Sequence, residues 1–174
     1  MDVKSIVCGA SKPRHWKIGA AAIMWWENTP ASHVYFYIKR DSGVNLLYQA
    51  IGSGTEFMGY QEFLKINEPV YEKEIKVEED KFEALLDYLI PRLKKKYSIK
   101  HLFGLFIKRG VYYYFNKKIP NYFADQGASE VCIESLFTMV EHQQIYKLAE
   151  NPEDMGMYEA LKALKDIPGK ELSV

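Results

Sequence analysis

The sequence predicts an α+β domain in which an antiparallel sheet carries helices packed on one side. Strand-like apolar runs occupy the first half of the chain, and helical spacing dominates the second half. No internal repeat or low-complexity tract interrupts this order. Strands followed by helices are typical of α+β folds, whereas a parallel sheet needs the two to alternate. Because the chain has 174 residues, we expect a single domain, residues 1–174.

The predicted strands are short runs of apolar, aromatic and β-branched residues bounded by turn formers. They are residues 4–9, 33–39, 45–51, 55–59 and 69–77. The second and third form a hairpin, in which Gly43 supplies the residue with positive φ. Side chains alternate along a strand, so Val34 and Phe36 share one face while His33 and Tyr35 share the other.

The predicted helices follow from apolar side chains at helical spacing and from residues that favour helix ends. They are residues 17–27, a turn at 60–65, residues 78–97 with a kink at Pro91, part of 98–115, residues 129–149 and a short helix in 151–167. In 98–115 we expect the helix to give way to a loop or strand. The last helix is expected to be capped near Asn151, with Pro152 at its first position.

Charge is balanced over the whole chain, with 23 basic and 23 acidic residues, but it is unevenly distributed. From Arg92 to Lys118 there are nine Lys or Arg and no Asp or Glu, and this basic band also contains several tyrosines. Such a band can hold an anionic partner. No apolar run is long enough to span a bilayer and no secretory signal is apparent, so we expect a cytoplasmic protein.

Cys132 is the candidate nucleophile. Ser129 is a plausible N-cap, which places Cys132 in the first turn of a helix, where backbone N–H groups and the helix dipole stabilise a thiolate. The same donors can hold an oxyanion. The alternative is that Cys132 is a small core residue, since free cysteine is often buried. We expect Cys8 to be buried in the first strand, and the two cysteines are too few for a disulfide framework.

His33 and Gln49 are the candidate base and its orienting partner. If residues 41–43 form the hairpin loop, Tyr35 lies opposite Gln49, and His33 and Gln49 become diagonal neighbours on one face. The amide oxygen then accepts from one imidazole nitrogen and leaves the other for the thiol. The alternatives are a structural histidine at a strand start and a solvent-facing glutamine. We expect His101 and His142 to lie on the surface.

The segments "SKPRHWKIG", "NTPASHVYFYI", "LLYQA", "FMGYQEFL" and "VCIES" resemble the circularly permuted NlpC-type branch of the papain-like cysteine hydrolases. The resemblance is to YiiX-like bacterial members and to bacteriophage proteins, and it covers most of the chain. It implies a permuted papain-like fold with Cys132 as nucleophile, His33 as base and Gln49 as the third residue. Two positions depart from the pattern: "CIES" replaces "CSEL", and Gln49 replaces a more common glutamate.

The resemblance implies a cysteine hydrolase, cytoplasmic or virion-associated, that acts on peptide or isopeptide amides, with cell-wall peptides as the leading case, or on acyl esters as in the lecithin retinol acyltransferase branch. An anionic cell-wall polymer would suit the basic band. The alternative is a virion or binding module of the same fold that contacts nucleic acid or a protein through residues 92–118, with little or no catalysis. No cofactor is expected, because neither metal-ligand spacing nor a phosphate-binding loop occurs.

Overall fold

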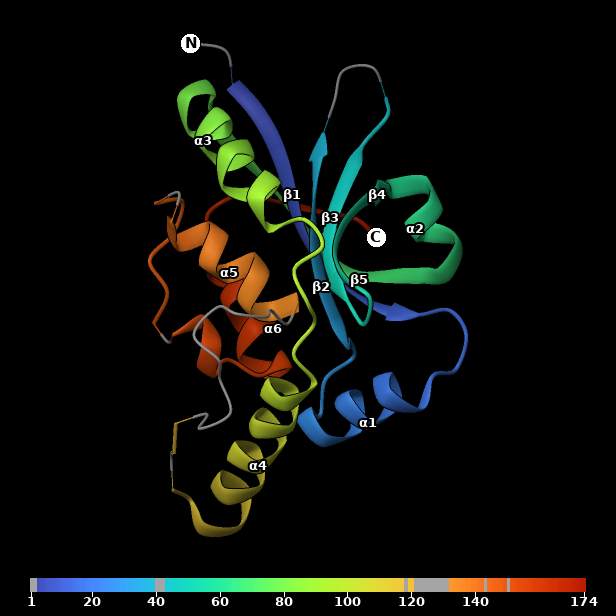
Figure 1. Cartoon of the computed structure of the whole chain (residues 1–174), viewed down its shortest axis with the longest axis vertical. Coiled ribbons are helices and arrows are strands. Elements are labelled where there is room, and N and C mark those ends of the chain that lie inside the picture. The colour runs from blue at the N-terminus through green and yellow to red at the C-terminus, as the bar shows by residue number, and fades with distance from the viewer. Residues whose placement is uncertain (1–2, 40–42, 118, 121–131, 143, 150) are drawn as a thin grey trace.

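The computed structural model describes residues 3–39, 43–117, 119–120, 132–142, 144–149 and 151–174. It is an α+β fold built on a six-stranded antiparallel sheet with the order β4-β3-β2-β1-β5-β6 (Figure 1). The strands are β1 (Val3–Pro13), β2 (His33–Lys39), β3 (Leu46–Ile51), β4 (Gly54–Gly59), β5 (Asn67–Glu78) and β6 (Lys170–Leu172). The helices are α1 (Ile18–Glu27), α2 (Tyr60–Ile66), α3 (Glu79–Leu89), α4 (Ile99–Phe115), α5 (Cys132–His142) and α6 (Met157–Asp166).

The five predicted strands are confirmed, and their pairing positions the site. In the β2–β3 hairpin, Phe36 pairs with Tyr48 and Tyr37 with Leu47, which is the register that the sequence predicts. Gly43 has φ 77° as expected, whereas the other two residues of the proposed loop, 41 and 42, lie outside the described part of the chain, as does residue 40. The short edge strand β6, which pairs with β5, is not predicted by the sequence.

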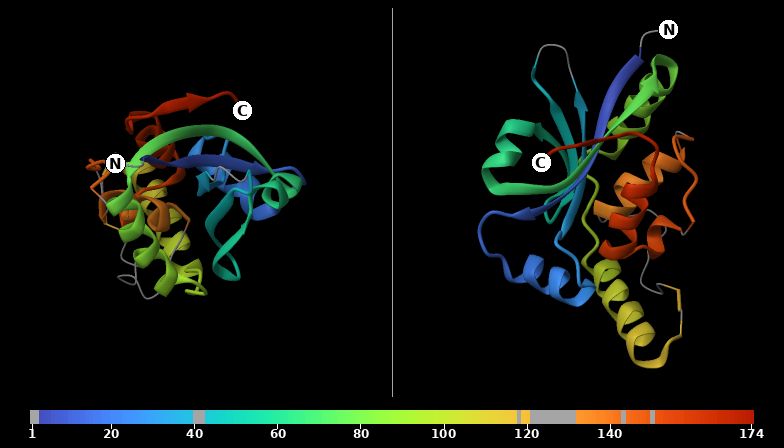
Figure 2. Two further views of the ribbon diagram at one scale, coloured as in Figure 1. Left: turned by 90° about the horizontal axis from the view of Figure 1, so that it is seen from above. Right: turned by 180° about the vertical axis from the view of Figure 1, so that it is seen from behind.

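The expectation that all helices pack on one side of the sheet is wrong. In Figure 1, α3, α5 and α6 lie on one side of the sheet and α2 lies on the other, while α1 and α4 lie at one end of the molecule, as the rear view in Figure 2 also shows. The main apolar cluster includes Val34 and Phe36 with residues of α5 and α6. A smaller cluster contains Tyr35 and Phe63 of α2. The alternation of side chains along β2 is thus confirmed.

Three helix predictions need correction. The helix predicted over 78–97 ends at Leu89 and passes into a 3₁₀ turn, Ile90–Arg92, so Pro91 ends the helix instead of kinking it. Residues 99–115 are helical throughout, without the expected loop or strand. The helix predicted over 129–149 stops at His142, and residues 129–131 lie outside the described ranges.

The end of the chain also differs from the prediction in detail. Asn151 caps a 3₁₀ turn, Pro152–Asp154, by accepting a hydrogen bond from the backbone of Glu153. The last helix, α6, starts only at Met157, where Glu159 accepts a hydrogen bond from the Gly156 backbone N–H. None of the helices in the described ranges is both long enough and apolar enough to cross a membrane.

Candidate active site

A chain of three hydrogen-bonded side chains crosses β2, β3 and β4. The Nε2 atom of His33 lies 3.0 Å from Oε1 of Gln49, and Nε2 of Gln49 donates to Oε1 of Glu56 at 3.0 Å. Gln49 and Glu56 are direct partners in the β3–β4 ladder, and Gln49 Nε2 also lies 3.0 Å from the sulfur of Met58. The predicted proximity of His33 and Gln49 is therefore confirmed, and it follows from the hairpin register.

Glu56 fixes the orientation of the Gln49 amide and, through it, the tautomer of His33. A carboxylate only accepts hydrogen bonds, so the NH₂ group of Gln49 must face Glu56 and the amide oxygen must face the imidazole. The Nε2 atom of His33 is then the protonated nitrogen. Nδ1 is left as the basic nitrogen, and it lies on the side of the ring nearest the β2 backbone, because it is bonded to Cγ.

Burial lowers the pKa of His33 to about 4; the hydrogen bond to Gln49 opposes this shift and the nearby Lys17 ammonium adds to it. The ring lies 6.4 Å from the ring of Phe63 and 6.5 Å from that of Tyr35, measured between centroids. His33 is thus a neutral imidazole at pH 7. A neutral imidazole is the form that a general base requires.

Cys132 begins the described part of α5, which packs on β2 and β3, and its side chain is buried. The backbone N–H of Val34 in β2 donates a hydrogen bond to its sulfur, as do the N–H groups of Ile133 and of Cys132 itself. These donors favour the thiolate, but burial outweighs them and raises the pKa of Cys132 above its ordinary value. The expectation of a stabilised thiolate in the free protein is therefore wrong, and its proposed cap, Ser129, lies outside the described residues.

Cys132 and His33 approach the same short stretch of β2 from the two faces of the sheet. Cys132 belongs to the apolar cluster beneath α5, whereas the His33 ring lies beside Phe63 of α2. The sulfur contacts the N–H of Val34, the residue that follows His33. Among the described residues no hydrogen bond joins the sulfur to the imidazole, so the structure brings the two groups to adjacent backbone positions without linking them.

Two hollows lie on this side of α5, and Cys132 lines the smaller of them. A recess of about 20 Å³ is lined by Cys132 and Ser32 together with apolar residues of α1, α4 and α5. It shares Glu27, Leu105 and Gly156 with a cavity of about 630 Å³ bounded by α1, α4 and the start of α6. A volume of this size is typical of small-molecule sites. The cavity therefore provides room for a ligand, and the residues that it shares with the recess separate it from the buried thiol.

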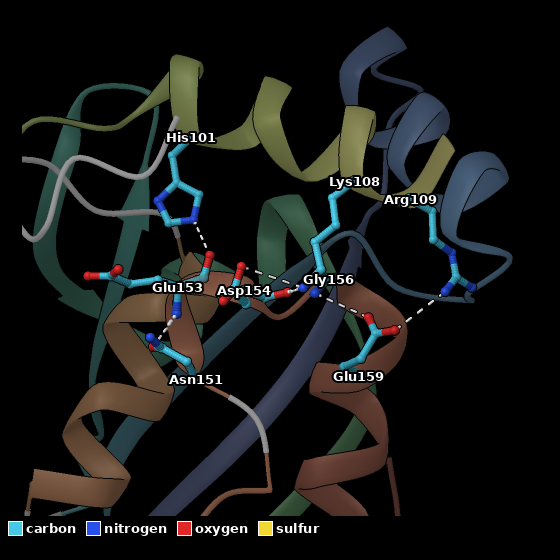
Figure 3. A network of polar contacts seen from close by, with 8 residues as sticks. All are labelled: His101, Lys108, Arg109, Asn151, Glu153, Asp154, Gly156 and Glu159. Atoms are coloured by element: carbon cyan, nitrogen blue, oxygen red, sulfur yellow. Dashed lines mark hydrogen bonds and ion pairs between the residues drawn. The ribbon is translucent and has the colours of Figure 1, made fainter. Parts of the chain in front are cut away.

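A network of polar contacts joins α4 to the segment before α6, at the border of this cavity (Figure 3). Lys108 Nζ lies 3.6 Å from Asp154 Oδ1 and donates to the Asp154 backbone carbonyl. Arg109 Nη1 lies 3.4 Å from Glu159 Oε1. Part of the predicted basic band thus forms ion pairs within the protein.

The prediction that His101 lies on the surface is wrong, because its side chain is 1% exposed. His101 Nε2 lies 2.8 Å from the carbonyl of Glu153, and Nδ1 lies 3.3 Å from Oε2 of Glu134 in α5. Burial alone would lower the pKa of His101, but the Glu134 carboxylate outweighs it and the pKa is raised. His142, by contrast, is exposed as expected.

Two carboxylates near the candidate site are not singled out by the sequence. Glu56 sits in a predicted strand, but its place opposite Gln49 depends on the register of the β3–β4 hairpin. Glu27 ends α1 and looks like an ordinary helix-end residue, yet its side chain is buried beside the cavity. The alternation of β4 could have assigned Glu56 to the Gln49 face, whereas Glu27 carries no local signal.

No protein-family description matches the chain, and no significantly similar curated protein or solved structure is found. Within the described ranges, no group of three or more histidine, cysteine, aspartate or glutamate side chains is arranged to hold a metal ion. Function must therefore be inferred from the geometry of the site.

Proposed function

We propose that the protein is a thiol hydrolase of the permuted papain-like, NlpC-type class, which cleaves a peptide or isopeptide amide through an acyl-enzyme on Cys132. The observation that supports this most is the Glu56–Gln49–His33 chain. It leaves Nδ1 of His33 as the basic nitrogen on one face of β2, while the Cys132 sulfur accepts a hydrogen bond from the N–H of the next residue, Val34, on the other face. A nucleophile, a base and a group that orients the base are the parts that covalent catalysis by a thiol needs.

Catalysis then requires the start of β2 to shift when the substrate binds, so that Nδ1 of His33 comes within reach of the thiol from across the strand and takes its proton while Nε2 stays bonded to Gln49. The thiolate attacks the substrate carbonyl, and the backbone N–H groups at the start of α5 stabilise the oxyanion. The imidazolium then gives its proton to the leaving amine, and the C–N bond breaks to leave a thioester. A water molecule, deprotonated by His33, attacks the thioester and releases the acid and the thiol.

The two pKa shifts define the resting state of this pair. Burial lowers the pKa of His33 and raises that of Cys132, so the free protein holds a neutral thiol and a neutral imidazole. Proton transfer then occurs only when a substrate is present. The amide of Gln49 orients the imidazolium, and the Glu56 carboxylate behind it supplies the negative charge that glutamine lacks.

Acylation by p-nitrophenyl acetate tests this proposal, since an activated ester needs no knowledge of the natural substrate. We expect a burst of nitrophenol and an acetyl group on Cys132 in the intact protein, detected by mass spectrometry. Cys132→Ala should abolish the adduct, and His33→Asn should slow its formation at least 100-fold. Cys8→Ala is the matched control, because Cys8 is buried and burial raises its pKa to about 12. An adduct that persists in Cys132→Ala, or equal rates in His33→Asn, would exclude the mechanism.

A second candidate is a binding module that contacts nucleic acid through the predicted basic, tyrosine-rich band. The observation in its favour is that Tyr113, Tyr114 and Phe115 at the end of α4 are 73 to 79% exposed, and the exposed Lys117 follows two residues after Phe115. Exposed aromatic side chains with lysines suit single-stranded nucleic acid. Binding of a fluorescent oligonucleotide that weakens steeply with salt, in a protein that p-nitrophenyl acetate does not acylate, would favour this candidate.

A further inference from the structure

The cavity bounded by α1, α4 and the start of α6 contains a buried carboxylate. Glu27 is 5% exposed, and it lines both the cavity and the recess that Cys132 borders. The Tyr158 backbone N–H donates to the carboxylate, and Arg109 Nε lies 3.9 Å from Oε2. Oε2 nevertheless accepts no hydrogen bond from any described residue. A buried carboxylate oxygen without a donor is costly, so this atom indicates a missing partner.

The charges that line the cavity leave Glu27 without a full counter-ion. Lys108 pairs with Asp154, and Arg109 is nearer to Glu159 than to Glu27, at 3.4 Å against 3.9 Å. These five groups are three carboxylates and two cations, which gives a net charge of −1. Burial and then the charge of Glu159 raise the pKa of Glu27. The cavity therefore favours a ligand that carries one positive charge.

The absence of a side chain at Gly156 lets the carboxylates of Glu27 and Glu159 lie directly against the backbone. A Cβ atom at position 156 would lie 2.8 Å and 3.0 Å from the two carboxylate oxygens of Glu27, and 2.9 Å from Oε2 of Glu159. Any larger residue would therefore press on both carboxylates. Figure 3 shows Gly156 between Lys108 and Glu159, at the start of α6.

We propose that this cavity binds a primary ammonium group of the substrate, with Glu27 as its counter-ion, while the substrate carbonyl reaches Cys132 through the shared recess. The substrate class is then an amide whose acyl part carries a free amine. This role of the cavity as a substrate site rests on the proposed hydrolase function. The binding of the amine itself does not, because Glu27 and the cavity exist without any catalytic step.

Direct binding tests the proposal independently of catalysis. The probes are 6-aminohexanoylglycinamide, which has one amine, and its N-acetyl form, both titrated calorimetrically into the Cys132→Ala protein. We expect the amine to bind at least tenfold more tightly than the acetylated probe, since a charge-assisted hydrogen bond to a buried carboxylate is lost on acetylation. Equal affinities of the two probes would overturn the proposal.

Variants of the same protein locate the binding group. Glu27→Gln should remove the preference for the amine, and Gly156→Ala should weaken amine binding by crowding the carboxylate. Glu62→Gln, on the exposed surface of α2, is the charge-matched control and should leave the preference unchanged. A full preference retained in a folded Glu27→Gln protein would also overturn the proposal. If Cys132 is never acylated but the amine preference depends on Glu27, the amine site stands and the hydrolase proposal fails.

Discussion

Two histidines of this molecule, the half-buried His33 and the buried His101, have surroundings that shift their pKa values in opposite directions. His33, at the start of β2, is hydrogen-bonded to the neutral amide of Gln49, and burial lowers its pKa to about 4. His101, in α4, faces the carboxylate of Glu134, and its pKa is raised although burial opposes the shift.

The difference teaches that burial by itself does not decide the charge of a histidine; the partner does. An amide orients a ring without favouring its protonated form as strongly as a charge does, so His33 remains a free base. A carboxylate holds the proton on His101, which then links α4 to α5 and, through its second nitrogen, to the carbonyl of Glu153. The proposed hydrolase function uses His33 as its base, whereas the contacts of His101 hold α4 against α5 and the segment before α6.

The largest expected effect concerns the partner of His33. Gln49→Leu removes the group that fixes the tautomer, so acylation of Cys132 by p-nitrophenyl acetate should slow about 100-fold. Stopped-flow measurement of the burst provides the rate. The control is His142→Asn, which changes an exposed histidine on the same helix as Cys132 and should leave the acylation rate unchanged. A normal rate in Gln49→Leu would show that His33 needs no orienting group and would remove the distinction between the two histidines.

The next effect concerns the partner of His101. Glu134→Leu removes the buried carboxylate and should lower the free energy of unfolding by about 2 kcal/mol at pH 7. The loss should be larger at pH 5.5, because keeping a buried His101 neutral then costs free energy. Urea denaturation at both pH values measures this, and replacing both His101 and Glu134 by leucine should recover part of the stability. The same loss at both pH values would contradict a charged pair.

The third expected effect is opposite pH dependence at the two histidines. Between about pH 4 and the ordinary value near 6.5, the unfolded chain binds a proton at position 33 that the folded chain does not. The contribution of His33 to stability is therefore lost as the pH falls through this window. The contribution of His101 is present below pH 6.5 and is lost as the pH rises through its raised pKa.

Titration of the imidazole protons by NMR distinguishes the two directly. One imidazole signal should titrate near pH 4 and be absent from the spectrum of His33→Asn. Another should titrate above pH 6.5, and its pKa should fall in Glu134→Leu. Two buried rings that titrate together near 6.5 would refute the comparison.

The smallest effect is expected at Glu56. In Glu56→Gln the new side-chain amide oxygen at position 56 can still accept the hydrogen bond from Gln49. The orientation of the Gln49 amide is therefore kept, and only the negative charge at position 56 is lost. Acylation of Cys132 should fall by only a few-fold, whereas Glu56→Leu should approach the effect of Gln49→Leu. A rate in Glu56→Gln as low as that in Gln49→Leu would mean that the charge, not the orientation, is what His33 needs.

The strands were predictable because their pattern is local. Alternation of apolar side chains identifies each strand, and one assumption about the β2–β3 turn was enough to place Gln49 beside His33. Helix ends were less predictable, since apolar residues continue at helical spacing past His142. There the chain turns at Gln144, which has φ 51°, and the backbone N–H of Ile145 bonds to the carbonyl of Val140.

Features of the site that depend on distant partners were not predictable. His101 looks like a surface residue because the groups that bury it, Glu134 and the carbonyl of Glu153, come 33 and 52 residues later in the chain. For the same reason the sequence predicts a lowered pKa for Cys132, whereas burial raises it. The sequence indicates a helix start, but not how deeply β2 and β3 bury the sulfur.

The strand order has a consequence for synthesis on the ribosome. β1 occupies the middle of the sheet, with β2 on one side and the later β5 on the other. The strands that hold His33, Gln49 and Glu56 also come early in the chain, so they are translated well before α5, which begins at Cys132. If the proposed function holds, a nascent chain that has emerged only as far as β5 contains the residues that accept the proton but not Cys132, so it should not be acylated at that residue until α5 emerges.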